Sequence, residues 1–145
     1  MSAREEAQQE SLEKALGILR EMLTDEQYQG MADRVASETD DFGREAFRHS
    51  IGHTYGDTWT RAGLSRNERS LLTIGLMIGL RTPTELAHQF KIAIRNGFTP
   101  RQIEEMILHA QPYVGILVAG AAGAVAQQSL GEIGIKLKDR SPEDE

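Results

Sequence analysis

Apolar residues recur at helical spacing along most of the chain and predict an all-α fold. Between residues 5 and 23, apolar positions are separated by Glu and Lys in the pattern of an amphipathic helix. Residues 24–40 are polar, and we expect a loop or a short helix there, before a second helical stretch at 41–56. The pattern therefore predicts an N-terminal helical arm at 1–40.

Three pairs of residues mark the starts of later helices. Each pair places a hydroxyl three residues ahead of Glu or Gln, which is the spacing of a capping box. The pairs are Ser65 with Glu68, Thr82 with Glu85, and Thr99 with Gln102. Pro83 and Pro100 follow two of these hydroxyls at the first helical position, where a missing N–H costs nothing.

The helix expected at 66–80 is apolar on nearly every side, so it should lie at the centre of the fold. It forms a helical hairpin with the next helix, at 83–96, which ends at Gly97. The third helix meets Pro112 about three turns after its start, and proline should kink or restart it there. A last helix is expected to run to about Leu130.

Small residues recur every fourth position in that last helix, at Gly115, Ala119 and Gly123. This smooth stripe fits ordinary core packing and a subunit interface equally well. The expected organisation is a single domain at 41–135 after the arm, followed by a charged tail at 136–145.

The composition excludes several classes of protein. With 16 Lys and Arg against 22 Asp and Glu, the net charge is −6, so no basic surface is expected for nucleic acid. The absence of Cys excludes disulfides, thiolate nucleophiles and thiolate metal sites.

Neither export nor a membrane span is expected. The first residues are acidic and polar, unlike a signal peptide, which favours a cytoplasmic location. The run from Met106 to Gly131 has no charged residue, but His109, Pro112 and Gln127 leave an apolar stretch shorter than the roughly 20 residues of a membrane span.

Three groups suited to acid-base chemistry follow one face of the third helix. Glu105, His109 and Tyr113 stand at i, i+4 and i+8. A carboxylate beside an imidazole orients it for proton transfer near neutral pH. A structural ion pair would give the same spacing, and the pattern alone leaves both open. A metal site is not expected, because this pair and the similarly spaced His49 and His53 lack further ligands.

A second group of polar and aromatic residues follows His53. It comprises Tyr55, Asp57, Trp59 and Arg61. The group is either a partly exposed helix end with an aromatic anchor or the wall of a pocket. In a pocket, Trp59 would exclude water and Arg61 would bind an anion.

Residues 55–115 resemble the carboxymuconolactone decarboxylases, relatives of the AhpD-type alkylhydroperoxidases. Several features match in order, and the ordered set is more specific than any one of them. They are Gly56, Asp57, Trp59 and Arg61; the run Arg69 to Leu71; the turn Asn96 to Thr99; and Ile103, Glu105, His109, Tyr113 and Gly115. Two positions depart from the family: Gln89 replaces a usual histidine, unless His88 substitutes for it, and Leu117 replaces a usual proline.

The resemblance implies an AhpD-like helical bundle built around a core helical hairpin. It also implies assembly into a ring-shaped homo-oligomer, a trimer or hexamer. The implied reaction is the decarboxylation of a small unsaturated lactone of the 4-carboxymuconolactone type, a step in aromatic compound catabolism that needs no cofactor.

The same resemblance suggests roles for individual residues. His109, oriented by Glu105, would donate a proton, and Tyr113 or Gln89 would hydrogen-bond the developing oxyanion. The substrate-binding set would be Trp59, Arg61, Arg69, Asp57 and His88, with Arg61 or Arg69 holding a substrate carboxylate.

Other activities fit the family less well or remain open. The thiol peroxidases carry two cysteines on the second helix, and the chain has Thr82 and Glu85 there. A repurposed member that catalyses an isomerisation or cyclisation is an alternative, motivated by Gln89 and Leu117. A non-catalytic binding or scaffold oligomer is another.

Overall fold

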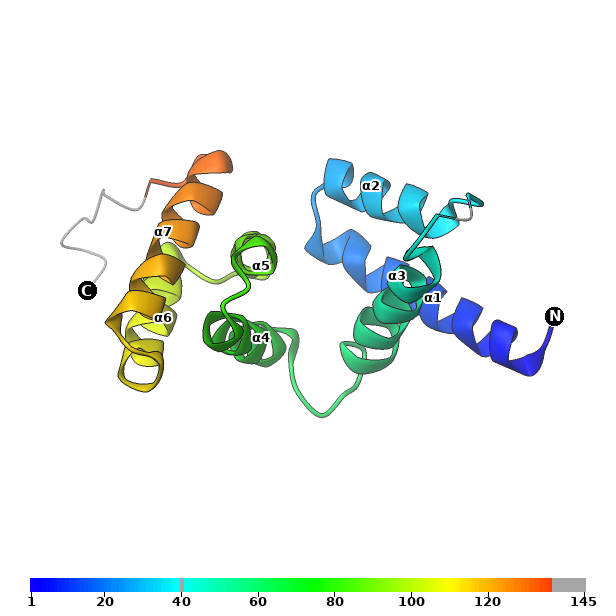
Figure 1. Ribbon diagram of the computed structural model, residues 1–145, viewed down its shortest axis with the longest axis horizontal. Helices are drawn as coiled ribbons and strands as arrows, with labels where there is room; N and C mark the ends of the chain where they lie inside the picture. The colour runs from blue at the N-terminus through cyan, green and yellow to red at the C-terminus, as the bar shows by residue number, and fades with distance from the viewer. Residues whose placement is uncertain (40, 137–145) are drawn as a thin grey trace. The chain divides into compact units, whose positions relative to one another are not determined.

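Every regular element is helical in residues 1–39 and 41–136, the residues that the computed structural model describes (Figure 1). The prediction of an all-α chain is confirmed. The predicted tail lies outside the described residues, apart from Lys136. The elements, in order, are α1 (Ala3–Met22), α2 (Asp25–Ala36), α3 (Arg44–Ile51), the π-helix η1 (Gly52–Thr58), α4 (Arg66–Leu80), α5 (Pro83–Arg95), α6 (Pro100–Val114) and α7 (Ile116–Glu132).

The chain divides into two compact units, residues 1–64 and 65–145. In the first unit, α1 packs most closely against η1 and also contacts α2 and α3. Its buried face consists of Leu12, Ala15, Leu19 and Met22. The four positions follow the 3.6-residue period, so the amphipathic pattern correctly predicted both the helix and its buried side.

The polar stretch at 24–40 contains a helix, α2, of twelve residues. Its start is fixed by a capping box, in which Thr24 and Gln27 each accept a hydrogen bond from the other's backbone N–H. Its C-terminal end is tied to α3, because Arg44 and Arg48 donate to the carbonyl oxygens of Ser37 and Val35. Cationic side chains are favourable at that end of a helix.

The core of the second unit surrounds Phe90, which is fully buried on α5. Helix α5 packs against α4 and α7, and α6 lies beside α7 (Figure 1). The other buried core residues are Ile74, Ile78, Leu86, Ala93, Ile103, Ala122, Ala126 and Leu130. These residues come from all four helices, so each helix of the unit buries one face in a common core.

Burial of α4 on nearly every side was expected, but only one face is buried. Ile74 and Ile78 lie in the core, whereas four leucines elsewhere on the helix are 49–71% exposed. The four are Leu71, Leu72, Leu76 and Leu80. Apolar residues on all sides of a helix therefore predicted more packing partners than this unit supplies.

Two of the three expected capping boxes are present. Ser65 with Glu68 and Thr99 with Gln102 make both reciprocal hydrogen bonds. The third prediction is wrong: Thr82 does not cap α5, and its hydroxyl instead donates to the carbonyl of Met77. Arg81 is in the left-handed conformation at the end of α4, and this tight turn brings Thr82 back to the last turn of α4.

The break between the last two helices is at Gly115 and not at Pro112. Helix α6 includes Pro112 and ends at Val114. Gly115 then has a φ of 89°, which strongly favours glycine. Of the predicted small-residue stripe, Ala119 is buried in α7, whereas Gly115 serves as the junction.

No helix in the described part of the chain is both long and apolar enough to cross a membrane.

Candidate active site

One face of α6 carries the acid-base groups that the sequence singled out. The rings of His109 and Tyr113 lie 5.6 Å apart, centroid to centroid, with an angle of 40° between their planes. Tyr113 is 80% exposed, and His109 is also exposed. An imidazole and a phenol are thus presented together on the solvent-facing side of this unit. Both can donate a hydrogen bond or a proton to a bound molecule.

Glu105, one turn before His109, is paired in the opposite direction. Its Oε1 lies 3.0 Å from Nη2 of Arg101. The other terminal nitrogen of this arginine, Nη1, lies 3.3 Å from Oε2 of Glu104. The Glu105 carboxylate therefore has a cationic partner one turn toward the N-terminus. That Glu105 orients His109 stays a prediction, because the spacing places Glu105 between two possible partners.

Helix α5 places Gln89 and His88 in different surroundings. The side chain of Gln89 is only 4% exposed, whereas His88 is exposed. The pKa of Glu132 on α7 is lowered chiefly by the Lys91 ammonium 2.5 Å away, and to smaller extents by Gln128 and His88. Gln89, not His88, therefore occupies the inward position where the resemblance implies a histidine.

The Arg69–Ser70 pair and the Asn96–Gly97 turn are connected in the structure. Ser70 is fully buried, and its hydroxyl accepts a hydrogen bond of 3.1 Å from Nδ2 of Asn96, the C-terminal capping residue of α5. This bond ties the first turns of α4 to the end of α5. Arg69 is half-buried beside Ser70. Two features that the sequence matched separately thus form one structural link.

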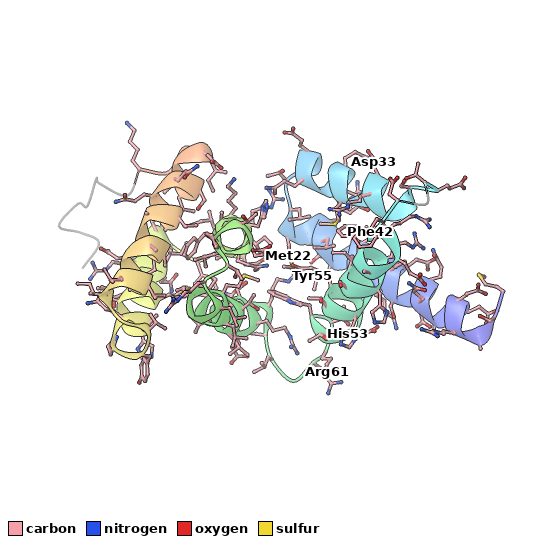
Figure 2. The ribbon with its side chains drawn as sticks, in the orientation of Figure 1. Met22, Asp33, Phe42, His53, Tyr55 and Arg61 are labelled. Carbon is pink, nitrogen blue, oxygen red and sulfur yellow. The ribbon has the colours of Figure 1, made fainter. Side chains whose placement is uncertain are left out.

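The segment with Asp57, Trp59 and Arg61 lies in the first unit, at the end of η1. Trp59 is 8% exposed, and its ring lies 5.8 Å from that of Tyr55. The backbone N–H of Trp59 donates to the carbonyl of Thr54, five residues earlier, as in a π-helix. Figure 2 shows Tyr55 on the helix and Arg61 on the loop that follows it. The indole of Trp59 is thus buried at the end of the helix, and the exposed Arg61 follows two residues later.

Asp57 is held by a residue that sequence reasoning missed. Ser11 of α1 donates its hydroxyl to Oδ1 of Asp57 at 2.6 Å, and Oδ2 lies 3.7 Å from Nδ1 of His53. The only signal in the sequence was the four-residue spacing of Gly52 and Gly56, whose missing side chains allow another backbone to approach this helix closely.

No group of three or more His, Cys, Asp or Glu side chains in the described residues is arranged to hold a metal ion. The candidate residues described above carry imidazole, phenol, amide, carboxylate and guanidinium groups. These groups are suited to binding an organic anion and to moving a proton.

Comparison with known proteins identifies the family. The sequence model of the carboxymuconolactone decarboxylase family matches residues 44–128, which include α3, η1, α4, α5, α6 and most of α7. The chain belongs to the carboxymuconolactone decarboxylase family. The predicted resemblance is thereby confirmed.

Two curated decarboxylases are similar to this chain. The 4-carboxymuconolactone decarboxylase of Acinetobacter baylyi is 30% identical over 103 residues, which cover 71% of this chain and 77% of that protein. The nitrosuccinic acid decarboxylase npaB of Metarhizium robertsii is 39% identical over 89 residues, 61% of this chain. The match spans 62% of that second relative.

Both of these relatives are named as decarboxylases, and the prediction that the chain is an enzyme of the carboxy-lyase class is confirmed at that level. The matched region contains both the Gly56–Arg61 segment and the exposed face of α6. It does not contain α1, which supplies Ser11.

Proposed function

We propose that this protein decarboxylates a small dicarboxylic acid that carries its own electron acceptor, with 4-carboxymuconolactone as the first candidate. The two relatives are named for 4-carboxymuconolactone and for nitrosuccinic acid. Both compounds are dicarboxylic acids in which a lactone or nitro group can accept an electron pair. A substrate of this class needs no cofactor to accept the electrons released with CO₂.

The observation that carries the proposal is the pairing of His109 and Tyr113 on one face of α6. In the proposed reaction, the carbon–carbon bond to the carboxylate breaks, CO₂ leaves, and the electron pair moves onto the lactone carbonyl as a dienolate. His109 then donates a proton to carbon, and Tyr113 or the inward Gln89 hydrogen-bonds the oxyanion.

The second carboxylate of such a substrate requires a cation. Arg61 and Arg69 are the two candidates, because guanidinium binds carboxylate with two parallel hydrogen bonds. Arg61 follows the buried Trp59, and Arg69 lies beside the buried Ser70, so each is attached to a fixed part of its own unit. We assign three further roles in the proposed mechanism. Trp59 would exclude water, and Asp57 and His88 would contribute to substrate binding.

Turnover by the purified protein tests the proposal. We expect CO₂ release from freshly prepared 4-carboxymuconolactone, measured as loss of substrate absorbance and by a coupled CO₂ assay. Nitrosuccinate is the second substrate to assay, because the relative named for it has the higher identity. If the protein releases CO₂ from neither acid at millimolar concentration, the proposed function is wrong.

We also propose that the protein assembles into a homo-oligomer, a ring of three or six subunits. The support is the set of large apolar side chains exposed in the second unit. Outside α4 they include Leu108, Ile116 and Leu117, each at least half exposed. Apolar surface of this extent is typical of an interaction site. Sedimentation velocity is expected to show a trimer or hexamer at micromolar concentration, and a stable monomer would contradict the proposal.

A further inference from the structure

The N-terminal helix makes an unusually close contact with η1. A Cβ atom on Gly56 would lie 2.0 Å from the carbonyl oxygen of Ser11, which no side chain can tolerate without movement of the backbone. A Cβ on Gly52 would lie 3.3 Å from the Cβ of Ser11. The two glycines therefore face the same residue of α1, and their missing side chains allow the contact.

The contact brings one hydroxyl to one carboxylate. Ser11 and Asp57 are 46 residues apart in sequence, and the donor–acceptor distance of 2.6 Å is that of a short O–H···O hydrogen bond. The other carboxylate oxygen faces His53. The hydroxyl thus holds the Asp57 carboxylate in an orientation with one oxygen toward α1 and the other toward His53.

Asp57 belongs to the same short helix that ends at Trp59. The π-helical hydrogen bond from Trp59 to Thr54 spans Asp57, so a rotation of this turn would move the carboxylate and the indole together. Single π-helical turns are frequent at functional sites. A residue that fixes Asp57 therefore also fixes the turn that leads to Trp59 and Arg61.

We propose that Ser11 is a positioning residue for the segment Gly56–Arg61. Ser11 acts through Asp57. The substrate-binding site would then depend on α1, which lies outside the region that the family model matches. The effect on substrate binding rests on the proposed function; the effect on the conformation of the segment does not.

A nucleophilic role for Ser11 does not fit the geometry. A catalytic serine requires a base that accepts its proton, with the carboxylate behind that base. Here the serine hydroxyl is bonded to the carboxylate itself, and the imidazole lies on the carboxylate's far side. The arrangement orients Asp57 and does not activate Ser11.

The test compares Ser11→Ala with Ser11→Thr, which retains the hydroxyl, and with Ser50→Ala, an exposed serine on α3. Two measurements are made on protein shown to be folded by circular dichroism. The first is the determination of KM and kcat with whichever of the two acids, 4-carboxymuconolactone or nitrosuccinate, the wild-type protein decarboxylates. The second is acrylamide quenching of Trp59, the chain's one tryptophan, whose fluorescence reports on this segment alone.

For Ser11→Ala we expect KM to rise about fivefold with kcat within about twofold of wild type, because the loss affects binding more than the chemical step. Quenching of Trp59 should increase about twofold as its turn loosens. Ser11→Thr should restore both values, and Ser50→Ala should match wild type. If Ser11→Ala does not fold, Ser11→Val replaces it, because Val has the shape of Thr without the hydroxyl.

Unchanged KM and unchanged quenching in a folded variant without the hydroxyl would overturn the proposal. So would equal defects in Ser11→Thr and Ser11→Val, because the hydroxyl would then have no role. If the wild-type protein turns over neither acid, the proposed function fails by itself. The quenching comparison between the Thr and Val variants then decides the role of Ser11.

Discussion

Replacing His109 by Ala is expected to lower kcat by about 10² to 10⁴-fold while KM changes little. The proposed reaction leaves a carbanion-like dienolate that must be protonated at carbon, and His109 is the proposed donor. In the proposed mechanism its neighbour Tyr113 contributes only a hydrogen bond, because a phenol is in general a weaker acid than an imidazolium ion. Steady-state rates of CO₂ release measure the effect.

The matched control is His49→Ala, an exposed histidine on α3 that the proposed mechanism does not use. Its kcat is expected to equal that of wild type. Tyr113→Phe should cost less than His109→Ala, because it removes a hydrogen bond and leaves the proton donor in place. Full turnover by His109→Ala would show that the donor is a different group.

Local sequence signals predicted the helices wherever a few neighbouring residues determine them. The capping boxes at Ser65 and Thr99 formed as expected, because each uses only groups within one turn. The same pattern failed at Thr82. There the preceding residue, Arg81, is in the left-handed conformation, and the hydroxyl bonds to the earlier helix. A cap pattern alone cannot say which helix will use the hydroxyl.

The spacing of Glu105, His109 and Tyr113 correctly predicted a shared face but not the partners on it. A residue at i can pair with i+4 or with i−4, and the second possibility at Glu105 is Arg101. Helical spacing therefore placed His109 beside Tyr113, whereas the carboxylate pairs with the guanidinium. Gln89 is buried and the adjacent His88 is exposed because of the way α5 packs on its neighbours. The apolar periodicity of the sequence predicts the buried face of α5 only approximately.

The link from Ser11 to Asp57 could not be predicted, because it joins residues that only the packing of α1 on η1 brings together. The sequence contained a general indication, the small residues Gly52 and Gly56 one turn apart. Such a pair indicates that another segment of the chain packs closely against this helix, but it does not identify that segment. The π-helical turn was equally hidden, since no residue type specifies it.

Replacing Gly56 by Ala is expected to destabilise the first unit by about 3 kcal/mol, near the upper end for added volume in a packed contact. The new methyl carbon would lie 2.0 Å from the carbonyl oxygen of Ser11, and a backbone atom cannot move aside as a side chain can. Thermal unfolding followed by Trp59 fluorescence measures the change, because that residue lies in the same unit.

Gly17→Ala is the matched control, because it makes the same substitution on the other partner of the contact, within α1. A Cβ there meets no atom within 4 Å, so the helix gains stability by roughly 0.5–1 kcal/mol without a clash. The two alanines should therefore shift the melting temperature in opposite directions. If Gly56→Ala were as stable as wild type, α1 and η1 would not pack as closely as described, and Ser11 could not hold Asp57. The same substitution thus tests the contact on which the positioning role depends.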